Sequence, residues 1–558
     1  MKTALLYFHT IIHLRPTQIY YQIFYKIRAG FRKITGFTYS QFVSVESHSI
    51  TLKPSIPSNQ SYFSEQNRFQ FLNQSQIFSD NKINWNDEKT FGKLWAYNLN
   101  YFDFLNQENI TKGEGLALIQ AYIREGQNLK TGFESYPISL RGINWIKFLS
   151  KYQIQDIEID GFLMAQYIRL VDNLEYHVMA NHLLENAFSL LFGGYYFRNQ
   201  ELLKVANKIF QKELPEQILA DGGHFERSPM YHQIILFRLL DCLNLVRCNL
   251  TRSVGRLNSS PVERDFKQTN NLAAFIENRG VSFEQILTFY TKKMLNFLQN
   301  ITFKNGDIPL VNDAAKNITT TTKQLFNYAN QLNMKPQKSI LSESGYRKFE
   351  NANYELLIDV GNTAPDYQPA HAHCDTLSFV LYVHGKPFIV DTGTSTYENN
   401  EIRQKERSIS AHNTVQIGNF EQSEIWSSFR VGRRAKAKIL SENEYEITAS
   451  HDGYKRIGII HQRSYSIKNQ AITIQDEIFG ATQYLQKAYL HFHPNVEINV
   501  TGNVVETNFG KINFENVLEI QLSEYYFSEE FNKRTRSKML TLIFEKHLTT
   551  TINIRPSA

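Results

Sequence analysis

The chain has 558 residues, of which 42% are hydrophobic and 20% are charged, and its formal net charge is +6. This length exceeds what one hydrophobic core supports, so we expect two or three domains, and the composition excludes a disordered protein. The mild positive charge is compatible with an anionic partner, but the sequence lacks the dense cluster of basic residues that nucleic-acid binding requires. The three cysteines, Cys242, Cys248 and Cys374, form no CxxC motif, which argues against a disulfide framework.

Residues 1–84 are predicted to be a mixed segment that packs on the rest of the protein. The first apolar run, MKTALLYFHTIIHLRP, is interrupted by His9 and His13 and precedes no small-residue cleavage motif, so we interpret it as part of the mature protein. No apolar stretch reaches the ~18 residues of a transmembrane helix. We therefore expect no stable membrane insertion and a cytoplasmic location, with the periplasm as the alternative. Residues 17–29 are typical of an amphipathic helix that docks on the body or on a partner.

Residues 85–340 are predicted to form a helical domain. Apolar residues recur at i, i+3 and i+4 spacing in segments that short Gly-, Asn- or Pro-bearing links separate. Successive helix pairs favour a helical array, either a solenoid or a closed toroid of hairpins. The longer polar passage at 249–281 is predicted to be a surface excursion. The predicted helices are 114–126, 139–152, 160–175, 179–192, 200–213, 229–248, 283–300 and 321–332.

Residues 341–558 are predicted to form a second domain made of strands. Short alternating segments such as YELLIDVG, LSFVLYV, PFIVDTG and AITIQDEI follow one another with turn residues between them. Alternation over four to eight residues indicates strands with one buried face, and many short strands favour an antiparallel β-sandwich. The sequence thus predicts an α+β multidomain protein whose domains meet near residue 340.

Two helical motifs carry candidate chemistry. In MANHLLEN, Asn181, His182 and Glu185 share one helix face at i, i+3 and i+4 spacing, although a polar stripe between packed helices would look the same. In DGGHFERSPMYH, Ser228 and Pro229 suit a helix start, which places Tyr231 in the first turn. There the helix dipole would lower the pKa of a tyrosine base, whereas a packing role is the simpler interpretation.

Aromatic residues next to amide and guanidinium groups indicate sugar recognition. Rings stack on sugar faces, and Asn and Arg bind hydroxyl and carboxylate groups. Two segments combine these residue types, WAYNLNY at 95–101 and YPISLRGINW at 136–145. The candidates are Tyr97, Asn100, Arg141, Asn144 and Trp145.

The stretch from His371 to Asn413 concentrates potential metal ligands around a predicted hairpin whose turn is His384-Gly385-Lys386. Two imidazoles and a carboxylate from one sheet suit a Zn²⁺-type ion. We predict that His373, Asp391 and His412 are its ligands. Ordinary polar residues at strand ends are the alternative, and the chain before Thr376 must fold back for the three to meet.

Together these motifs resemble the heparinase II/III-like polysaccharide lyases. The matching elements are LNYFDFL, YPISLRGINWIKFL, NHLLEN, DGGHFERSPMYHQ, HAHCDTLSFVLYVHGKPFIVDTGT and RSISAHNTV, in the family's order over residues 95 to about 415. The resemblance implies an incomplete (α/α) toroid followed by an antiparallel β-sandwich, with the active site in the cleft between them. It also implies β-elimination on a uronic-acid-containing anionic polysaccharide.

The resemblance implies roles for individual residues. Asn181 and His182 match the pair that engages the uronate carboxylate, Tyr231 matches the catalytic tyrosine, and His371 matches the catalytic histidine. His373, Asp391 and His412 match ligands of a structural metal, predicted to be Zn²⁺. The lack of a secretion signal is similar to relatives associated with surface or capsular polysaccharide production. Expected substrate contacts are Tyr97, Asn100, Arg141, Asn144, Trp145, Glu185, Glu226, Arg227 and Arg407.

Two other functions are compatible with the same residues. A metal-dependent glycan hydrolase would use zinc to activate water, and a non-catalytic scaffold would bind an acidic glycan without cleaving it. Which of Tyr231 and the histidines acts as base or acid depends on the stereochemistry of the uronate. The oligomeric state is open.

Overall fold

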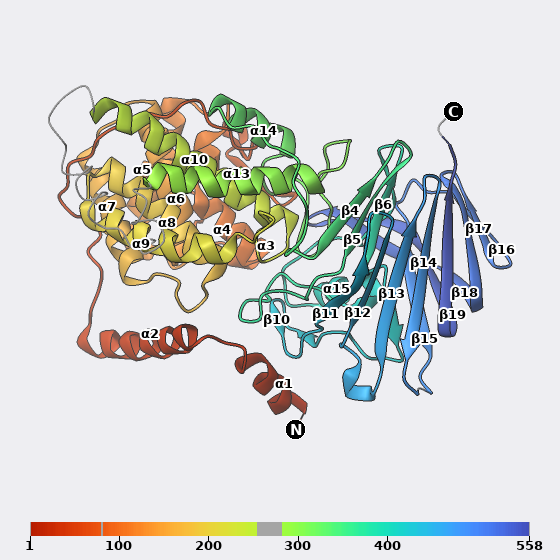
Figure 1. Ribbon diagram of the computed structural model, residues 1–558. Coiled ribbons are helices and arrows are strands. Elements are labelled where there is room, and N and C mark those ends of the chain that lie inside the picture. The colour runs from red at the N-terminus through yellow and green to blue at the C-terminus, as the bar shows by residue number, and fades with distance from the viewer. Residues whose placement is uncertain (1, 80–81, 254–281, 482, 557–558) are drawn as a thin grey trace.

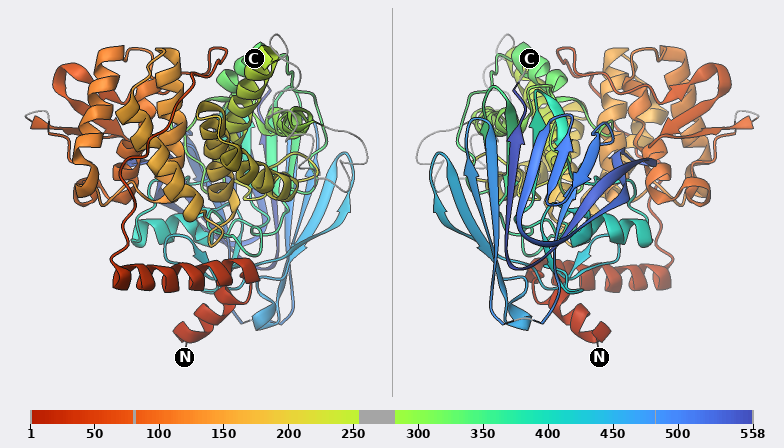
Figure 2. Two further views of the ribbon diagram at one scale, coloured as in Figure 1. Left: turned by 90° about the vertical axis from the view of Figure 1, so that its left-hand side faces the viewer. Right: turned by 90° about the vertical axis from the view of Figure 1, so that its right-hand side faces the viewer.

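The computed structural model describes residues 2–79, 82–253, 282–481 and 483–556 (Figure 1). The predicted excursion at 249–281 therefore lies mostly outside the described residues. Two helices, α1 (Lys2–Ile11) and α2 (Pro16–Thr35), lie along one edge of the molecule (Figures 1 and 2). Among the described residues, no helix is long and apolar enough to cross a membrane.

The first domain is helical, as predicted. Each of the eight predicted helices is present, because amphipathic periodicity is a local signal that packing then stabilises. The sequence did not predict two short helices, α3 (Glu88–Phe91) and α4 (Lys93–Tyr101), or an antiparallel sheet of β1 (Tyr62–Phe63), β2 (Arg68–Phe71) and β3 (Gln74–Ile77). The remaining helices are α5 (Lys112–Glu125), α6 (Ser135–Lys151), α7 (Ile157–Asp172), α8 (Ala180–Tyr196), α9 (Gln200–Gln217), α10 (Pro229–Ser253), α13 (Phe283–Ile301) and α14 (Thr322–Gln331).

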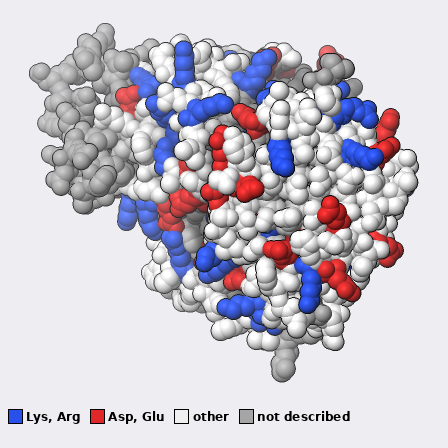
Figure 3. Space-filling view, turned by 45° about the vertical axis from the view of Figure 1, so that its right-hand side comes forward, with Lys and Arg blue, Asp and Glu red and all other residues white. Residues whose placement is uncertain are grey.

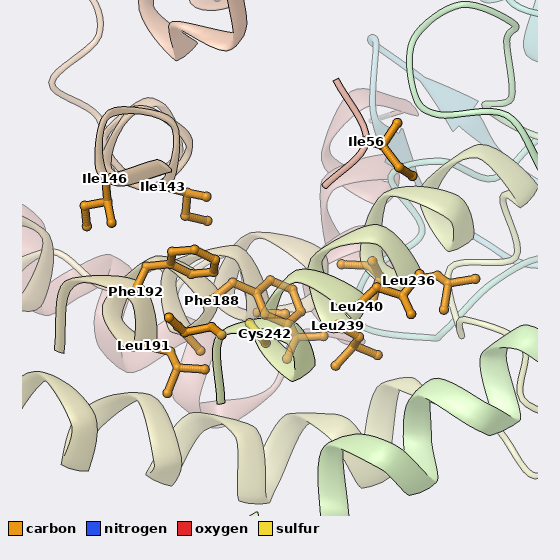
Figure 4. Close-up of a cluster of buried hydrophobic side chains, with 14 of the residues drawn as sticks. Ile56, Ile143, Ile146, Phe188, Leu191, Phe192, Leu236, Leu239, Leu240 and Cys242 are labelled. Carbon is orange, nitrogen blue, oxygen red and sulfur yellow. The ribbon is translucent and has the colours of Figure 1, made fainter. Parts of the chain in front are cut away.

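The core of the helical domain is formed where α6, α8 and α10 meet. Ile143 and Ile146 from α6 lie over Phe188 and Phe192 from α8, and α10 adds Leu239 and its neighbours (Figure 4). α6 and α8 are buried on nearly all sides. Helices buried all round must satisfy their polar side chains internally, which matters for the polar residues that they carry.

The second domain is built from antiparallel strands. A four-stranded sheet runs in the order β4 (Tyr346–Glu350), β5 (Tyr354–Asp359), β6 (Phe379–Val383) and β7 (Lys386–Ile389). Every residue of β5 is buried, because one face of this sheet packs on the helices and the other on the larger sheet. Phe303, for example, stacks on Tyr382 of β6 with 3.8 Å between ring centroids. The small sheet therefore joins the two domains.

The larger sheet has ten strands in a mostly linear order, β11-β12-β13-β14-β19-β18-β17-β16, and β15 pairs with β19 and β8. Burial alternates along β13 and β14, as expected for strands that cover a core on one face. On the face seen in Figure 3, basic and acidic side chains are interspersed. The strands are β8 (Val415–Ile417), β11 (Ala437–Glu442), β12 (Glu446–His451), β13 (Ile460–Ile467), β14 (Ala471–Phe479), β15 (Gln486–His491), β16 (Ile498–Thr501), β17 (Val504–Thr507), β18 (Gly510–Glu530) and β19 (Lys533–Ile554).

Three short elements lie between β7 and β11 in sequence, on either side of β8. They are helix α15 (Glu401–Arg407) and the paired strands β9 (Ile425–Trp426) and β10 (Arg430–Val431). The change from helices to strands occurs between Gln331 and Tyr346. Architecture and order match the predicted toroid and sandwich.

Candidate active site

A cavity of about 1230 Å³ lies where the helical domain meets the strand domain. Both domains and the N-terminal helices contribute to its lining. Helices α4, α6, α8 and α10 form one side, and the loops around His371, Tyr397 and Phe429 form the other. The volume is large enough for several sugar residues rather than one small ligand. Predicted site residues that line it are Tyr97, Asn144, Asn181, His182, Tyr231 and His371.

Tyr231 and His371 meet in this cavity, as predicted. The backbone N–H of Tyr231 donates to Ser228 Oγ (3.3 Å), so Ser228 caps α10 and fixes its first turn. The phenol ring stacks on the His371 imidazole with 3.8 Å between centroids. The Tyr231 hydroxyl also lies 3.4 Å from the Tyr397 hydroxyl. A phenol and an imidazole from different domains therefore share one site.

The predicted lowering of the Tyr231 pKa is wrong. Burial raises the pKa of Tyr231 well above 10, and the neighbouring Tyr397, Asp313 and Glu226 raise it further. Removing a charged phenolate from water costs more free energy than the helix dipole returns, because a helix terminus contributes only about 0.3–1 kcal/mol. In the absence of substrate, Tyr231 is therefore a protonated phenol.

His371 is held by Asp313, a residue that the sequence did not single out. His371 Nδ1 donates to Asp313 Oδ2 (2.9 Å), and Arg403 Nη2 donates to the same oxygen (2.7 Å). His373 Nε2 contacts the other oxygen at 2.9 Å. Burial alone would raise the pKa of Asp313, but Arg403 and the two histidines hold it well below 3.8. An ionised Asp313 keeps the proton of His371 on Nδ1 and leaves Nε2 as an acceptor.

Asn181 and His182 lie at a strained helix start. Met179 and Ala180 have φ values of 66° and 54°, a left-handed region that non-glycine residues adopt at a cost of ~1–3 kcal/mol. Asn181 donates its backbone N–H (3.0 Å) and its amide to Glu226, which leaves its Oδ1 buried without a partner among the described residues. Such strain is typical of a functional site.

His182 is a candidate cation on the helical side of the cavity. Its Nδ1 contacts Glu175 Oε1 at 2.9 Å, its ring lies 4.6 Å from that of Tyr136, and its side chain is 36% exposed. Burial lowers the pKa of His182, but Glu175 outweighs burial and the net shift is upward. His182 can therefore present an imidazolium to an anionic ligand.

Several predicted substrate contacts are instead parts of the core. Arg141 is fully buried and donates to Gln166, Asn100 O and Gly132 O. Asn100 donates to the Trp85 and Ala96 carbonyls. These groups satisfy carbonyls that would otherwise be buried without donors. The prediction that they bind substrate is wrong.

The same correction applies to four more residues. Trp145 packs among aromatic rings with 0% exposure, and Glu185 pairs with Arg238 at 2.6 Å. Arg407 is buried and donates to the carbonyls of Ala372, Ser427 and Ser428. Arg227 is partly exposed, lies outside the cavity lining and donates to the Asn362 carbonyl. Amide and guanidinium side chains can bind sugars or donate hydrogen bonds to buried carbonyls, so the residue type alone does not predict which role a residue has.

Glu226 does not line the cavity but stands directly behind it. It accepts from Asn181, and its Oε2 lies 3.5 Å from His371 Nε2. The one carboxylate therefore adjoins both a helical-domain and a strand-domain candidate. It is therefore placed to hold Asn181 and to adjoin His371 without lining the cavity itself.

The three predicted metal ligands converge next to this site. His412 Nδ1 contacts Asp391 Oδ2 at 2.7 Å, and the rings of His373 and His412 are 5.3 Å apart. Turn residues His384 and Gly385 (φ 50° and 73°) close the predicted hairpin, and the β6–β7 register shifts between Leu381 and Tyr382. The segment before Thr376 folds back, as predicted, so that His373 lies on the same side.

The donor types at this cluster fit a Zn²⁺-type ion. His373 Nδ1 and His412 Nε2 are buried and have no hydrogen-bond partner among the described residues. Burial lowers the pKa of His373 to about 4, so its imidazole is neutral, as a metal ligand must be. In the described part of the chain, no three His, Cys, Asp or Glu side chains already stand in coordinating positions. Metal binding stays a prediction.

Comparison with known proteins places this geometry in a family. The model described as "Heparinase II/III-like, C-terminal" matches residues 333–555, and the one described as "Heparinase II/III N-terminus" matches residues 143–269. Together the two segments cover more than half of the chain. The chain belongs to the heparinase II/III-like family. The resemblance seen in its motifs is thereby confirmed.

Relatives of this heparinase II/III-like chain include two curated proteins, both named heparin-sulfate lyase. The one from Bacteroides stercoris is 24% identical over 62% of this chain and 48% of its own length. The one from Bacteroides thetaiotaomicron is 23% identical over 49% of this chain and 40% of its own length. The matched region thus spans less than half the length of either relative.

Solved structures share the fold. The crystal structure of heparinase III superposes with a TM-score of 0.69 and 17% identity, covering 93% of this chain and 88% of that one. Heparan sulfate lyase HepC from Pedobacter heparinus superposes with a TM-score of 0.54 and 15% identity, covering 88% and 82%. At these identities the likeness establishes the toroid-plus-sandwich fold of the heparinase II/III-like chain.

Sequence reasoning missed three residues that organise the site. Asp313 follows the apolar run IPLV as part of an Asn-Asp pair, and Tyr397 and Arg403 lie in the polar passage after Thr394. An acidic residue directly after an apolar run was the available signal for Asp313. Tyr397 offered none, and Arg403 was only one of several polar residues clustered beyond the predicted hairpin, because the roles of both depend on contacts with residues 166 and 90 positions away.

Proposed function

We propose that this protein is a polysaccharide lyase that cleaves a uronic-acid-containing anionic polysaccharide by β-elimination. The observation that carries the proposal is the Tyr231 phenol stacked on the His371 imidazole, in a cavity that Asn181 and His182 also line. β-Elimination needs a group that offsets the uronate carboxylate, a base for the C5 proton and an acid for the departing O4. The cavity contains a candidate for each of these three roles.

We assign the first role to His182 with Asn181. An imidazolium at His182 offsets the carboxylate as charge develops on it, and Asn181 lies next in the chain at the same helix start. Arg141 was the alternative, but its guanidinium is fully buried against Gln166 and two carbonyls.

The proton transfers are assigned from the hydrogen bond of His371 and the raised pKa of Tyr231. His371 holds its proton on Nδ1 against Asp313, so Nε2 can accept the C5 proton. Tyr231, whose pKa burial raises, keeps its phenolic proton and can donate it to O4. Proton removal from carbon breaks the C5–H bond, a C4–C5 double bond forms, and the C4–O4 bond breaks. The two side chains thus act as a base–acid pair.

A Zn²⁺-type ion bound by His373, Asp391 and His412 would brace the loop that carries His371, without contacting the cleaved bond. His373 shares the Asp313 carboxylate with His371, so fixing one imidazole also restrains the other. In this proposal the chain's own residues perform the chemistry.

We further propose that the substrate is a uronate polysaccharide without dense sulfation. Several cavity cations already have carboxylate partners: Lys147 with Asp241 (2.8 Å) and Lys316 with Asp307 (3.1 Å). Arg238 pairs with Glu185, and acidic residues such as Glu398 and Glu530 also line the cavity. Of the lysines and arginines that line the cavity, only Arg430 and Arg434 lack a carboxylate partner among the described residues, so a densely sulfated polymer would meet positive charge at few positions. The link to surface or capsular polysaccharide production, and the cytoplasmic location, stay predictions.

The test uses a panel of uronate polysaccharides with and without sulfate. A lyase produces unsaturated ends that absorb in the far ultraviolet, and we expect them first from an unsulfated member. Tyr231→Phe should abolish most of that signal while leaving binding intact, whereas Tyr97→Phe, which removes a hydroxyl elsewhere in the cavity, should not. New reducing ends without absorbance would favour a hydrolase, and binding without chain shortening would favour a scaffold. Either result contradicts the lyase proposal.

A further inference from the structure

Helix α2 presents an apolar face to solvent. Ile19, Ile23, Ile27 and Phe31 follow one another at i, i+4 spacing, so they form a row along the helix. Ile23 is 54% exposed, Ile27 67% and Phe31 65%. Ile34, one turn further on, is 86% exposed. A contiguous row of this kind on a soluble protein marks an interaction surface.

The opposite, polar face of α2 is the one that contacts the body. Gln18 donates to the Val178 carbonyl (3.3 Å), and the Tyr25 hydroxyl donates to the Leu174 carbonyl (2.6 Å). Arg28 pairs with Asp172 at 2.8 Å. A surface helix ordinarily buries its apolar stripe against the core, so α2 is inverted. Intramolecular packing therefore does not explain its apolar row.

Helix α1 extends this surface. Leu5, Phe8 and Ile12, at i, i+3 and i+7 spacing, are at least half exposed. Its other side is tied to the strand domain, where Trp426 Nε1 donates to Thr10 Oγ1 (3.1 Å) and His9 contacts Glu424 (3.0 Å). Both helices lie at the same edge of the molecule (Figures 1 and 2). The exposed rows are thus held on a fixed scaffold.

The charge of this segment has one sign. Residues 1–45 contain six Lys or Arg residues and no Asp or Glu. Lys26 and Lys33 are exposed, lie two turns apart on α2 and have no ion-pair partner among the described residues. At 100° per residue they flank the apolar row on one side. An apolar face flanked by lysines is the pattern of a helix that lies in a membrane interface.

We propose that α1 and α2 form a peripheral docking surface for an anionic phospholipid bilayer. The apolar rows would lie at the level of the headgroups and upper acyl chains, and Lys26 and Lys33 would contact lipid phosphates. Charge complementarity favours this occupant over a second copy of the chain, because a symmetric pair would bring the two like-charged segments together. Docking of this kind needs no spanning helix, consistent with the described helices.

Docking would place the bilayer beside the cavity. Thr10, Leu14, Gln18 and Gln22, from the same two helices, line that cavity. This step rests on the proposed function: a lyase so oriented acts on a uronate polysaccharide that is itself held at, or emerging from, the membrane surface. The reaction class that supplies the substrate would then be polymer synthesis or export at that membrane.

The test is flotation of the purified full chain with vesicles of phosphatidylglycerol and phosphatidylcholine, compared with phosphatidylcholine alone. We expect binding to the anionic vesicles that decreases with salt. The triple variant Ile23→Ser/Ile27→Ser/Phe31→Ser should weaken binding at least ~100-fold, because three apolar contacts are lost. Lys26→Gln/Lys33→Gln should weaken it about 25-fold, or about fivefold per lysine.

The matched control is Ile340→Ser/Leu518→Ser/Leu522→Ser, which removes exposed apolar residues elsewhere and should leave binding unchanged. All variants change exposed side chains, so thermal unfolding should be unaltered. Absence of vesicle binding, equal binding to neutral vesicles, or a solution dimer that the triple variant converts to monomer would each overturn the proposal. The flotation contains no polysaccharide, so its result does not depend on lyase activity. The triple variant should turn over a soluble substrate normally, so a failure of membrane docking can be distinguished from a failure of the lyase proposal.

Discussion

On the helical wall of the cavity, defined by Asn181, His182 and Tyr231, the first two side chains are held by different carboxylates and the backbone of the third is held by Ser228. On the strand wall, His371 lines the cavity, His373 and Arg403 lie buried behind it, and one carboxylate, Asp313, binds all three. Substitution of a residue that holds one side chain disturbs that side chain, whereas substitution of a residue that holds several side chains disturbs all of them. The walls should therefore respond differently to substitution, and four predictions test this.

The largest effect should follow from Asp313→Asn. It leaves the fully buried Arg403 without an ionised partner, and an uncompensated buried charge costs about 3–5 kcal/mol. Urea unfolding should show that loss, and turnover should fall because His371 is no longer oriented. Glu506→Gln, which breaks an exposed pair with Lys511, is the control and should cost at most about 1 kcal/mol. Equal losses of unfolding free energy in the two variants would contradict the proposed difference between the walls.

Next in size is the loss of proton transfer. Tyr231→Phe and His371→Ala should each lower turnover ~10²–10⁴-fold, and Tyr231→Phe should leave the unfolding midpoint unchanged. Because the two side chains are proposed to act in one reaction, the double variant should be little worse than the poorer single variant. Multiplicative losses would mean that the stacked pair does not act as a unit.

Metal removal should act on the strand wall. Zinc analysis of the purified protein is expected to show a bound ion, and chelation should lower the thermal midpoint. A ligand present at 100 times its dissociation constant stabilises by about 2.7 kcal/mol. His412→Ala should abolish the chelator response, whereas His384→Asn, at an exposed turn, should keep it. If the purified parent protein contains no metal and His412→Ala is as stable as the parent, the predicted metal site is wrong.

Over the mildly acidic pH range, the smallest effect is a pH dependence of stability on the helical side. His232 is buried, accepts from the His224 backbone N–H (3.3 Å) and contacts the Met294 carbonyl (3.0 Å). Burial lowers the pKa of His232 to about 3, whereas the unfolded imidazole titrates near 6.5. The unfolded chain therefore binds the proton first, so stability is full above about pH 6.5 and falls as the pH drops toward 3, by up to ~1.4 kcal/mol per pH unit.

The measurement for this last prediction is urea unfolding between neutral and mildly acidic pH. His232→Gln should flatten the dependence relative to the parent protein, and His384→Asn should not. If both variants keep the parent slope, burial of His232 contributes nothing to acid sensitivity.

The sequence by itself determined the elements and the local chemistry. Helical periodicity in residues 112–331 and alternation after residue 346 are short-range patterns, and the eight predicted helices are present because packing reinforced them. The adjacent Asn181 and His182, and the Ser-Pro-Met-Tyr start of α10, could likewise be recognised from the sequence. Helix capping and helix-face spacing involve neighbours within four residues. The meeting of Tyr231 and His371 in one site followed from the family resemblance, whereas the stacking of their rings did not.

Only the tertiary structure decided what each polar residue faces. Arg141 and Asn100 have the side chains of a sugar site but satisfy buried carbonyls, and Asp313 became central through contacts up to 90 residues away. Burial reversed the expected pKa shift of Tyr231. The amphipathic pattern of residues 17–29 predicted a helix, but not that its polar face would turn inward. Burial and long-range pairing depend on the whole chain, and no local pattern encodes them.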